Sequence, residues 1–267
     1  MSENNTELNL NSKCSCVKEI SGRVPVGRVI EKLDSLFGKN DIEGAGRLLE
    51  FWENEARNMN DRKGLLSILD EEIGYFRRTG EHEKAYRSVL EAFELIDTLG
   101  MKDSLSGATI YLNGATTLRA SGHADMALPY YAAAKTVYEK RLSEKDCRMA
   151  AFYNNIAATY EELGMYGEAE KSYLRAVDIL SENNDIHGDA AVSYVNLACL
   201  YYKIDPADER IYNAMEAAEQ ILLSDGCTHD GEFAFTLSKC ISAFEFFGYF
   251  STEKILKGMM ESIYERA

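Results

Sequence analysis

Four asparagines carry the most regular chemistry in the sequence. Asn113, Asn155 and Asn196 follow one another at intervals of 42 and 41 residues, and Asn154 lies beside the middle one. A carboxamide both donates and accepts hydrogen bonds, so a row of amides could hold the backbone of an extended chain without demanding a particular sequence. The alternative is that these amides bond neighbouring helices and serve only the fold.

Groups typical of catalysis show no such order. The four histidines are His82, His123, His187 and His229, and the sequence contains no HExxH, GxxxxGK[ST] or GxSxG motif. The run 227–230 places Cys, Thr, His and Asp together, but it lies within SDGCTHDGEF, which is typical of a flexible connection. We therefore expect no catalytic site and no enzyme activity.

Cysteine usage gives no sign of a metal or of a disulfide framework. The six cysteines are Cys14, Cys16, Cys147, Cys199, Cys227 and Cys240. They are scattered through a chain without an export signal, so we expect reduced thiols that mostly serve as small buried apolar groups. Cys14 and Cys16 form a CxC without a second pair or a nearby His, so we expect no metal site and no cofactor.

Composition narrows the class of partner. The 267 residues include 46% apolar and 10% aromatic residues, enough for a sizeable core. Lys and Arg number 29 against 44 Asp and Glu, a formal charge of -15, which argues against nonspecific binding to nucleic acid or anionic membranes. No run approaches the roughly 18 apolar residues of a membrane span, and the N-terminus lacks a signal-peptide core. We expect a cytoplasmic protein that binds neither nucleic acid nor membrane.

Small residues recur at a period near 42, and this pattern predicts the helices that carry the asparagines. One set, at intervals of 40, 42 and 42 residues, comprises Ala45, Ala85, Ala127 and Ala169, with weaker counterparts at Ile211 and Glu253. A second set, twelve residues earlier, comprises Leu33, Ile73, Ala115 and Ala157, with Ala198 displaced by one, and Ile241. Apolar residues three and four apart surround both sets, so each unit should contain two helices. A fixed period of this size indicates a solenoid.

Glycine marks the turn between the two helices of a unit. It stands at matching places in four units, at Gly80, Gly122, Gly164 and Gly248. The first unit has Asn40 there, and the fifth has Asp205-Pro206, which ends the helix by another route. We expect units near 26–62, 66–102, 107–144, 149–186, 190–226 and 232–267, forming one domain over 25–267. Residues 1–24 are polar and aperiodic, so we expect a disordered tail.

The motif residues resemble the tetratricopeptide repeat. In the fourth unit they are Tyr153, Ile156, Ala157, Tyr160, Gly164, Ala169, Tyr173 and Ala176; in the third they are Tyr111, Ala115, Leu118, Gly122, Ala127, Tyr131 and Ala134. The period of 42 is similar to that of the long-helix branch found in kinesin light chains and bacterial peptide-sensing regulators. The resemblance implies an all-α fold, a right-handed α-solenoid of about six antiparallel helix pairs.

The resemblance also implies where a ligand would bind. In this family the first helices line a concave groove that holds peptides, so we expect a non-catalytic scaffold that binds a protein or peptide there. Further inward positions in this sequence are Arg77, Arg78, Arg119, Tyr202, Lys203 and Lys239. The three arginines could read an acidic stretch of ligand; the alternative is solvated charge at helix ends. Asp70 stands where a chaperone-binding carboxylate clamp needs a lysine, so chaperone C-termini are poor candidates.

Two other functions remain open. The protein could be a regulator whose solenoid changes shape when a peptide binds. It could also be a structural protein that associates with itself, because the stretch 244–250, followed by Met259 and Met260, is rich in aromatic and apolar residues at the end of the solenoid. A last helix pair without a polar cap would expose part of this stretch and favour a homodimer through the C-terminal pair.

Overall fold

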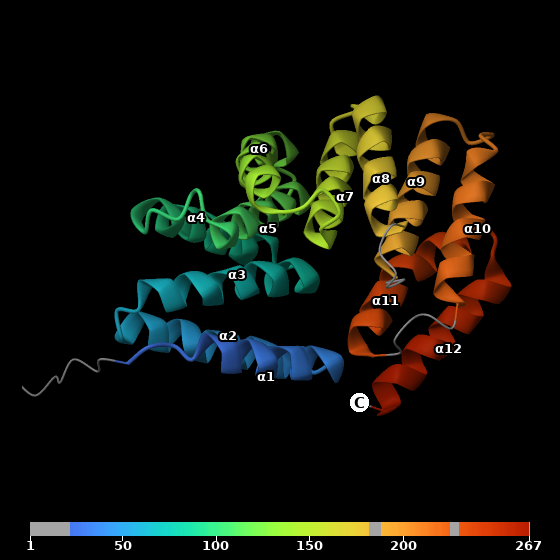
Figure 1. The fold of residues 1–267 in the computed structure, drawn as a ribbon. Helices are drawn as coiled ribbons and strands as arrows, with labels where there is room; N and C mark the ends of the chain where they lie inside the picture. The colour runs from blue at the N-terminus through green and yellow to red at the C-terminus, as the bar shows by residue number, and fades with distance from the viewer. Residues whose placement is uncertain (1–21, 182–187, 225–229, 267) are drawn as a thin grey trace, which may run out of the picture.

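The computed structural model describes residues 22–181, 188–224 and 230–266, and within these ranges every regular element is a helix (Figure 1). The helices are α1 (Val26–Gly38), α2 (Ile42–Asn58), α3 (Arg62–Thr79), α4 (His82–Thr98), α5 (Leu105–Ala120), α6 (Ala124–Arg141), α7 (Cys147–Glu162), α8 (Tyr166–Ser181), α9 (Asp189–Ile204), α10 (Arg210–Leu222), α11 (Gly231–Phe246) and α12 (Phe250–Arg266). The expected all-α fold is confirmed. Cys14, Cys16, His187, Cys227 and His229 lie outside the described residues.

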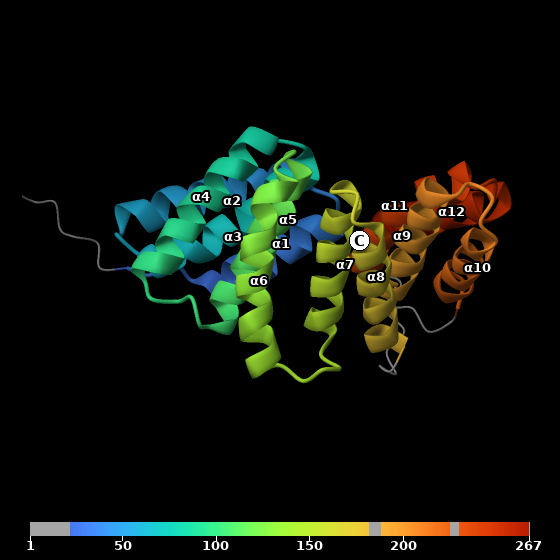
Figure 2. The same cartoon turned by 90° about the horizontal axis from the view of Figure 1, so that it is seen from above.

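Successive helices pack as pairs, and the pairs stack. Each odd-numbered helix packs on the even-numbered helix that follows it, and each odd-numbered helix also packs on the next odd-numbered one. The odd-numbered helices thus form an inner layer and the even-numbered helices an outer one, and the stack curves through space (Figures 1 and 2). This is the expected α-solenoid of antiparallel helix pairs.

The turns inside the pairs follow the glycine pattern. Gly80, Gly122, Gly164 and Gly248 have φ of 75°, 81°, 74° and 83°, and Asn40 has φ of 55°. A side chain with a Cβ is strained in this left-handed region, which is why glycine, or else asparagine, ends the first helix of a pair. The local backbone at these places is therefore dictated by the residue type.

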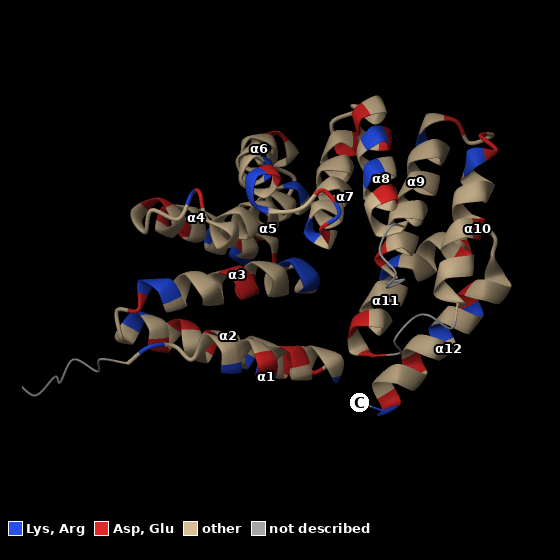
Figure 3. Cartoon of the chain, viewed as in Figure 1, with Lys and Arg blue, Asp and Glu red and all other residues tan. Residues whose placement is uncertain are grey.

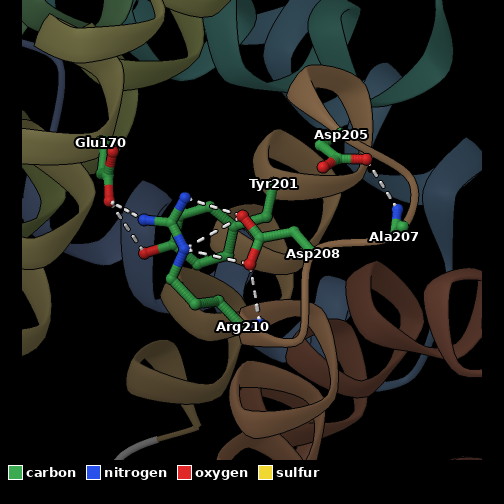
Figure 4. Close-up of polar contacts among 6 residues, drawn as sticks. All are labelled: Glu170, Tyr201, Asp205, Ala207, Asp208 and Arg210. Atoms are coloured by element: carbon green, nitrogen blue, oxygen red, sulfur yellow. Dashed lines mark hydrogen bonds and ion pairs between the residues drawn. The ribbon is translucent and has the colours of Figure 1, made fainter.

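The fifth unit has no glycine at the turn between its two helices, and charged side chains hold this turn instead. Arg210, at the start of α10, forms ion pairs with Asp208 and with Glu170 of α8, each at 2.7 Å (Figure 4). Its guanidinium also lies 4.1 Å from the ring centre of Tyr201 in α9. One side chain thus connects three helices around the 205–209 turn, which replaces the backbone device of the other units.

The small residues of the repeat are where the helices approach most closely. Ala45, Ala85, Ala127 and Ala169 of the second helices are all completely buried, and so are Ala115, Ala157 and Ala198 of the first helices. Large side chains fill the space beside them, and Tyr131 and Tyr173 are among the largest fully buried ones. The period of 42 residues therefore records the packing of one helix pair.

The chain begins to pack before the first helix. Val24 is buried, and its N–H donates a hydrogen bond of 2.9 Å to Asp61, which also caps α3. Residues 22–24, which the sequence assigns to the tail, therefore lie against the first two units.

The two ends of the solenoid meet. Helix α1 packs on α11 (Figure 1). The guanidinium of Arg78, from the end of α3, lies over the rings of both Phe37 in α1 and Phe235 in α11. The curvature of the stack therefore brings the first and last units into contact.

Charge is mixed over the surface. Lys and Arg positions are spread over helices at both ends and in the middle of the solenoid (Figure 3). Across the described ranges, no helix combines the length and the apolar character needed to cross a bilayer.

Candidate functional site

A cavity of about 620 Å³ lies among the inner helices α5, α7, α9 and α11. We call it the groove cavity. Six of the ten expected site residues line it: Arg119, Asn154, Asn155, Asn196, Lys203 and Lys239. The spacing of the repeat thus brings together residues from four units on one concave surface.

The amide of Asn154 is held in one orientation. Its Nδ2 donates to the Oγ of Ser193 on α9 at 2.7 Å, while the Ser193 hydroxyl donates to the backbone oxygen of Asp189 at 3.1 Å. Because the hydroxyl has a single proton, it can only accept from Asn154, and Oδ1 must point the other way. Within the described part of the chain, this buried Oδ1 has no hydrogen-bond partner. An unpaired buried acceptor costs about 1–3 kcal/mol.

Asn155 of α7 and Asn196 of α9 line the same cavity, the groove cavity. Both are half-buried. Among the described residues, neither side-chain amide has a hydrogen-bond partner, although the backbone oxygen of Asn155 accepts from Tyr131 at 3.3 Å. These two amides are therefore available to a ligand without breaking a bond within the protein.

Charged side chains surround the amides in equal numbers. The cations are Arg119, Lys203 and Lys239, and the anions are Glu161, Glu162 and Asp189. Two ion pairs form between them: Arg119 with Glu162 at 3.5 Å and Lys203 with Glu161 at 3.4 Å. Because each pair has one exposed member and a long N–O separation, each adds little stability. The cavity carries no net charge from these six groups.

Arg119 and Lys239 are the least satisfied of the cations. The Nε of Arg119 is buried and has no acceptor among the described residues. The ammonium of Lys239 lies 4.3 Å from the centre of the Phe235 ring. Partial burial lowers the pKa of Lys239, and the nearby Asp189 opposes this effect. Both side chains can therefore accept a ligand group as a better partner than they now have.

The other four expected residues lie outside the groove cavity. Asn113 donates to Asp70 at 2.8 Å, and burial raises the pKa of that carboxyl. The Nη1 of Arg77 donates to the backbone oxygen of Asn113 at 3.3 Å, and burial lowers the pKa of Arg77. These contacts join α3 to α5, which is the alternative role that the sequence left open for the amide.

Arg78 and Tyr202 are also placed elsewhere. The Arg78 guanidinium lies 5.0 Å from the ring centre of Phe37 and 4.4 Å from that of Phe235. Tyr202 packs edge-on against Phe246 and Phe247, with ring centres 5.1 and 5.7 Å away. The expected group of three arginines is thus divided among three different environments.

Two cysteines line the groove cavity, which the sequence did not predict. Cys147 and Cys199 are exposed, so the expectation of mostly buried thiols is wrong for both, while Cys240 is buried as expected. Cys199 lies three residues after Asn196 on α9, and helical spacing alone would have placed it on the same face. Over the described ranges, no group of three or more His, Cys, Asp or Glu side chains is arranged to hold a metal ion.

The fold and the repeat have known relatives. A tetratricopeptide repeat model matches residues 148–222, from α7 to α10. This segment belongs to the tetratricopeptide repeat family. It carries Asn154, Asn155, Asn196 and Lys203, so the amides of the groove cavity lie on the matched repeats. No curated protein matches the sequence.

Solved structures extend the likeness in fold to most of the chain. Kinesin-light-chain-type TPR-like repeats from Podosopora anserina have a TM-score of 0.52 at 15% identity, covering 74% of this chain and 94% of theirs. BtubC (BKLC) from P. vanneervenii has a TM-score of 0.50 at 20% identity, covering 91% and 92%. A Rap protein complexed with Competence and Sporulation Factor has a TM-score of 0.59 at 13% identity, covering 90% and 75%. At these identities the likeness shows the shared solenoid fold.

Proposed function

We propose that this protein is a non-catalytic interaction scaffold that binds an extended peptide, or an extended segment of a protein, in the groove cavity. The observation that carries the proposal is the set of three amides on α7 and α9: two without partners and one with an unpaired, fixed Oδ1. A peptide backbone offers N–H and C=O groups in alternation, which is the complement of such a set. The Rap protein of the same fold was solved with Competence and Sporulation Factor, which is a further reason to test peptides.

Charge plays a smaller part in this proposal than the sequence suggested. The six charged groups of the cavity balance, and only Arg119 of the three arginines lines it. We infer that hydrogen bonds to the amides supply most of the affinity, with Arg119 and Lys239 favouring carboxylate groups of the segment. Because Lys and Arg are spread over the helices (Figure 3), the proposal includes neither nucleic acid nor membrane as a partner. The proposed location is the cytoplasm. The proposal also treats 25–267 as one domain.

Self-association through the C-terminal helix pair is a second candidate. Phe246 and Phe250 are 62% and 66% exposed, and Phe246 forms a cluster with Tyr202 and Phe247 at the end of the inner layer. Exposed aromatic clusters of this kind favour an interface. Light scattering distinguishes the two candidates, because a monodisperse monomer at high protein concentration excludes the homodimer.

The groove is tested with a peptide array and a matched pair of double variants. Asn155→Ala with Asn196→Ala removes both unpartnered amides, while Asn58→Ala with Asn213→Ala removes two exposed amides of the outer helices α2 and α10. Two lost hydrogen bonds of about 0.5–1.5 kcal/mol each predict a drop in affinity of roughly 5- to 150-fold for the first variant. The second should bind as the native protein does. Binding that survives in the groove variant removes the amides from the account.

A further inference from the structure

The first and last units of the solenoid meet at two glycines. Gly38 is the last residue of α1 and Gly231 the first residue of α11. A Cβ added to Gly231 would lie 2.5 Å from the Cα of Gly38 and 3.1 Å from its carbonyl oxygen. The two backbones are therefore too close to admit a Cβ at Gly231, and the missing side chain of this glycine permits the contact.

Arg78, on a third helix, also stabilises the contact between α1 and α11. Its guanidinium lies between Phe37 of α1 and Phe235 of α11, within reach of a cation–π interaction with each ring. Arg78 belongs to α3, so it connects the first and second units to the sixth. We call these five residues, Phe37, Gly38, Arg78, Gly231 and Phe235, the latch.

The latch is a small contact with opposing forces beside it. A cavity of about 900 Å³ adjoins it, so the ends of the solenoid touch without a continuous apolar core between them. Carboxylates line this cavity from both sides and outnumber the two arginines there, Arg77 and Arg78: they are Asp34 and Glu71 on α1 and α3, and Asp230 and Glu232 at the start of α11. Like charges facing each other favour separation of the two ends, and the cation–π contacts oppose it. Contacts balanced in this way can open without unfolding the units.

The latch and the groove cavity share one aromatic ring. Phe235 contacts Arg78 of the latch at 4.4 Å and Lys239 of the groove cavity at 4.3 Å. Both Phe235 and Lys239 belong to α11, which packs on α9 along the cavity. A displacement of α11 therefore changes both places at once.

We propose that the latch is a reversible closure, so that the protein alternates between a closed ring and an open arc, and that the state of the groove cavity is coupled to this change. The first part depends on the latch alone. The second part rests on the proposed function, because the coupling matters only if a ligand binds in the groove cavity. A ligand that engages Lys239 and binds one of the two states more tightly would shift the ring–arc equilibrium toward that state.

Closure has a consequence that an open solenoid lacks. In a linear stack each unit touches only its neighbours, and the terminal units open independently of each other. In a closed ring α1 and α11 protect each other, although nine described helices, α2 to α10, separate them in the chain order. Breaking the latch should therefore lower the local stability of both terminal units and leave that of the middle units unchanged.

The experiment compares Gly231→Ala with Gly38→Ala. Both replace a glycine by alanine at a helix terminus, but a Cβ at Gly38 meets nothing within 4 Å, whereas at Gly231 it meets backbone. For Gly231→Ala we expect a larger radius of gyration by small-angle X-ray scattering, and faster amide hydrogen exchange in α1 and α11 with α5 to α8 unchanged. Gly38→Ala should match the native protein. Identical scattering and exchange in both variants would overturn the closed ring.

A second set of variants tests the latch in case Gly231→Ala does not fold. Arg78→Gln keeps a polar side chain but removes its charge, so it should open the ring as Gly231→Ala does. Arg78→Lys keeps a cation between the rings and should remain largely closed. If Arg78→Gln and Arg78→Lys both give the same X-ray scattering and the same amide hydrogen exchange as the native chain, the cation–π latch is excluded.

The coupling is tested without a ligand by the thiol of Cys199. This exposed side chain lines the groove cavity on α9, away from the latch residues. We expect its rate of reaction with N-ethylmaleimide, followed by peptide mass spectrometry, to change severalfold in Gly231→Ala and to stay unchanged in Gly38→Ala. Equal rates in an opened ring would overturn the coupling, while loss of peptide binding in the earlier array would affect only the proposed function.

Discussion

The side-chain nitrogen of Asn154 donates to the Ser193 hydroxyl at 2.7 Å, and that bond decides which atom of the amide remains unpaired. Ser193 is completely buried, and its own proton goes to the backbone oxygen of Asp189. The groove cavity is thus preorganised by Ser193, a residue of α9 that does not itself line the cavity.

This relationship predicts a large difference between two alanine variants. Ser193→Ala leaves the Asn154 nitrogen buried without an acceptor, which should lower the free energy of unfolding by about 1–3 kcal/mol. Asn154→Ala removes both the donor and the unpaired Oδ1, so it should cost less. Urea denaturation of both single variants and of the double variant measures this. A double variant as unstable as the sum of the singles would contradict the bond.

The alanines of the repeat predict overpacking. Ala157 and Ala169 are completely buried where two helices meet. Leucine at either place should lower the free energy of unfolding by about 1–3 kcal/mol, because the backbone must move to admit three more carbon atoms. Ala132, exposed on α6, provides the control, and leucine there should leave the melting temperature unchanged. A native melting temperature for Ala157→Leu would remove the basis of the repeat register.

The contacts at the turn of the fifth unit predict that the planar guanidinium of Arg210 matters as well as its charge. Arg210 pairs with Asp208 and Glu170 and lies on Tyr201, but it is half exposed. We therefore expect Arg210→Met to cost only about 1 kcal/mol. Arg210→Lys should restore little of this, because a single ammonium cannot bond both carboxylates in the plane of the guanidinium. Thermal unfolding at low salt measures both variants, and full restoration by lysine would contradict this geometry.

Glu72 predicts a dependence of stability on pH. Burial in the α3–α4 pair, together with the charge of Glu53, raises the pKa of Glu72 to about 8, while the hydrogen bond from Ser88 opposes the shift. A carboxyl with a raised pKa holds its proton more tightly in the folded state. It therefore stabilises the fold fully below its unfolded pKa of about 4.5, and this contribution is lost as the pH rises to about 8.

Glu72→Gln should remove this dependence. The amide is neutral at every pH and can still accept from Ser88, so the variant should be more stable than the native protein at pH 8.5 and closer to it at pH 5. Melting temperatures over this range, with Glu94→Gln on the exposed face of α4 as the control, measure the difference. A constant gap between variant and native protein across the range would argue against a protonated Glu72.

Much of the fold follows from local features of the sequence. The spacing of Ala85, Ala127 and Ala169 predicts the helix pairs because each alanine marks one packing contact, and Gly122 predicts a turn because its φ of 81° excludes most other residues. Asn155 and Asn196 could be placed on one surface for the same reason. These predictions need only the residues of one unit and its neighbour.

What could not be predicted depends on distant contacts. The capture of Asn113 by Asp70 requires the register between α3 and α5, and the same spacing leaves Asn155 free. The position of Arg78 between Phe37 and Phe235 depends on the curvature accumulated over all units, because small rotations between neighbours decide whether the ends meet. The residue pattern of a single unit does not predict this accumulated curvature.

The most direct test of the groove is nuclear magnetic resonance of the side-chain amides during titration with a peptide that binds in the array. The account predicts shifts of the Asn155 and Asn196 NH₂ signals, while the Asn113 signal, held by Asp70, and the exposed Asn58 and Asn213 signals remain in place. Shifts confined to the outer helices, with Asn155 and Asn196 unmoved at saturation, would contradict it.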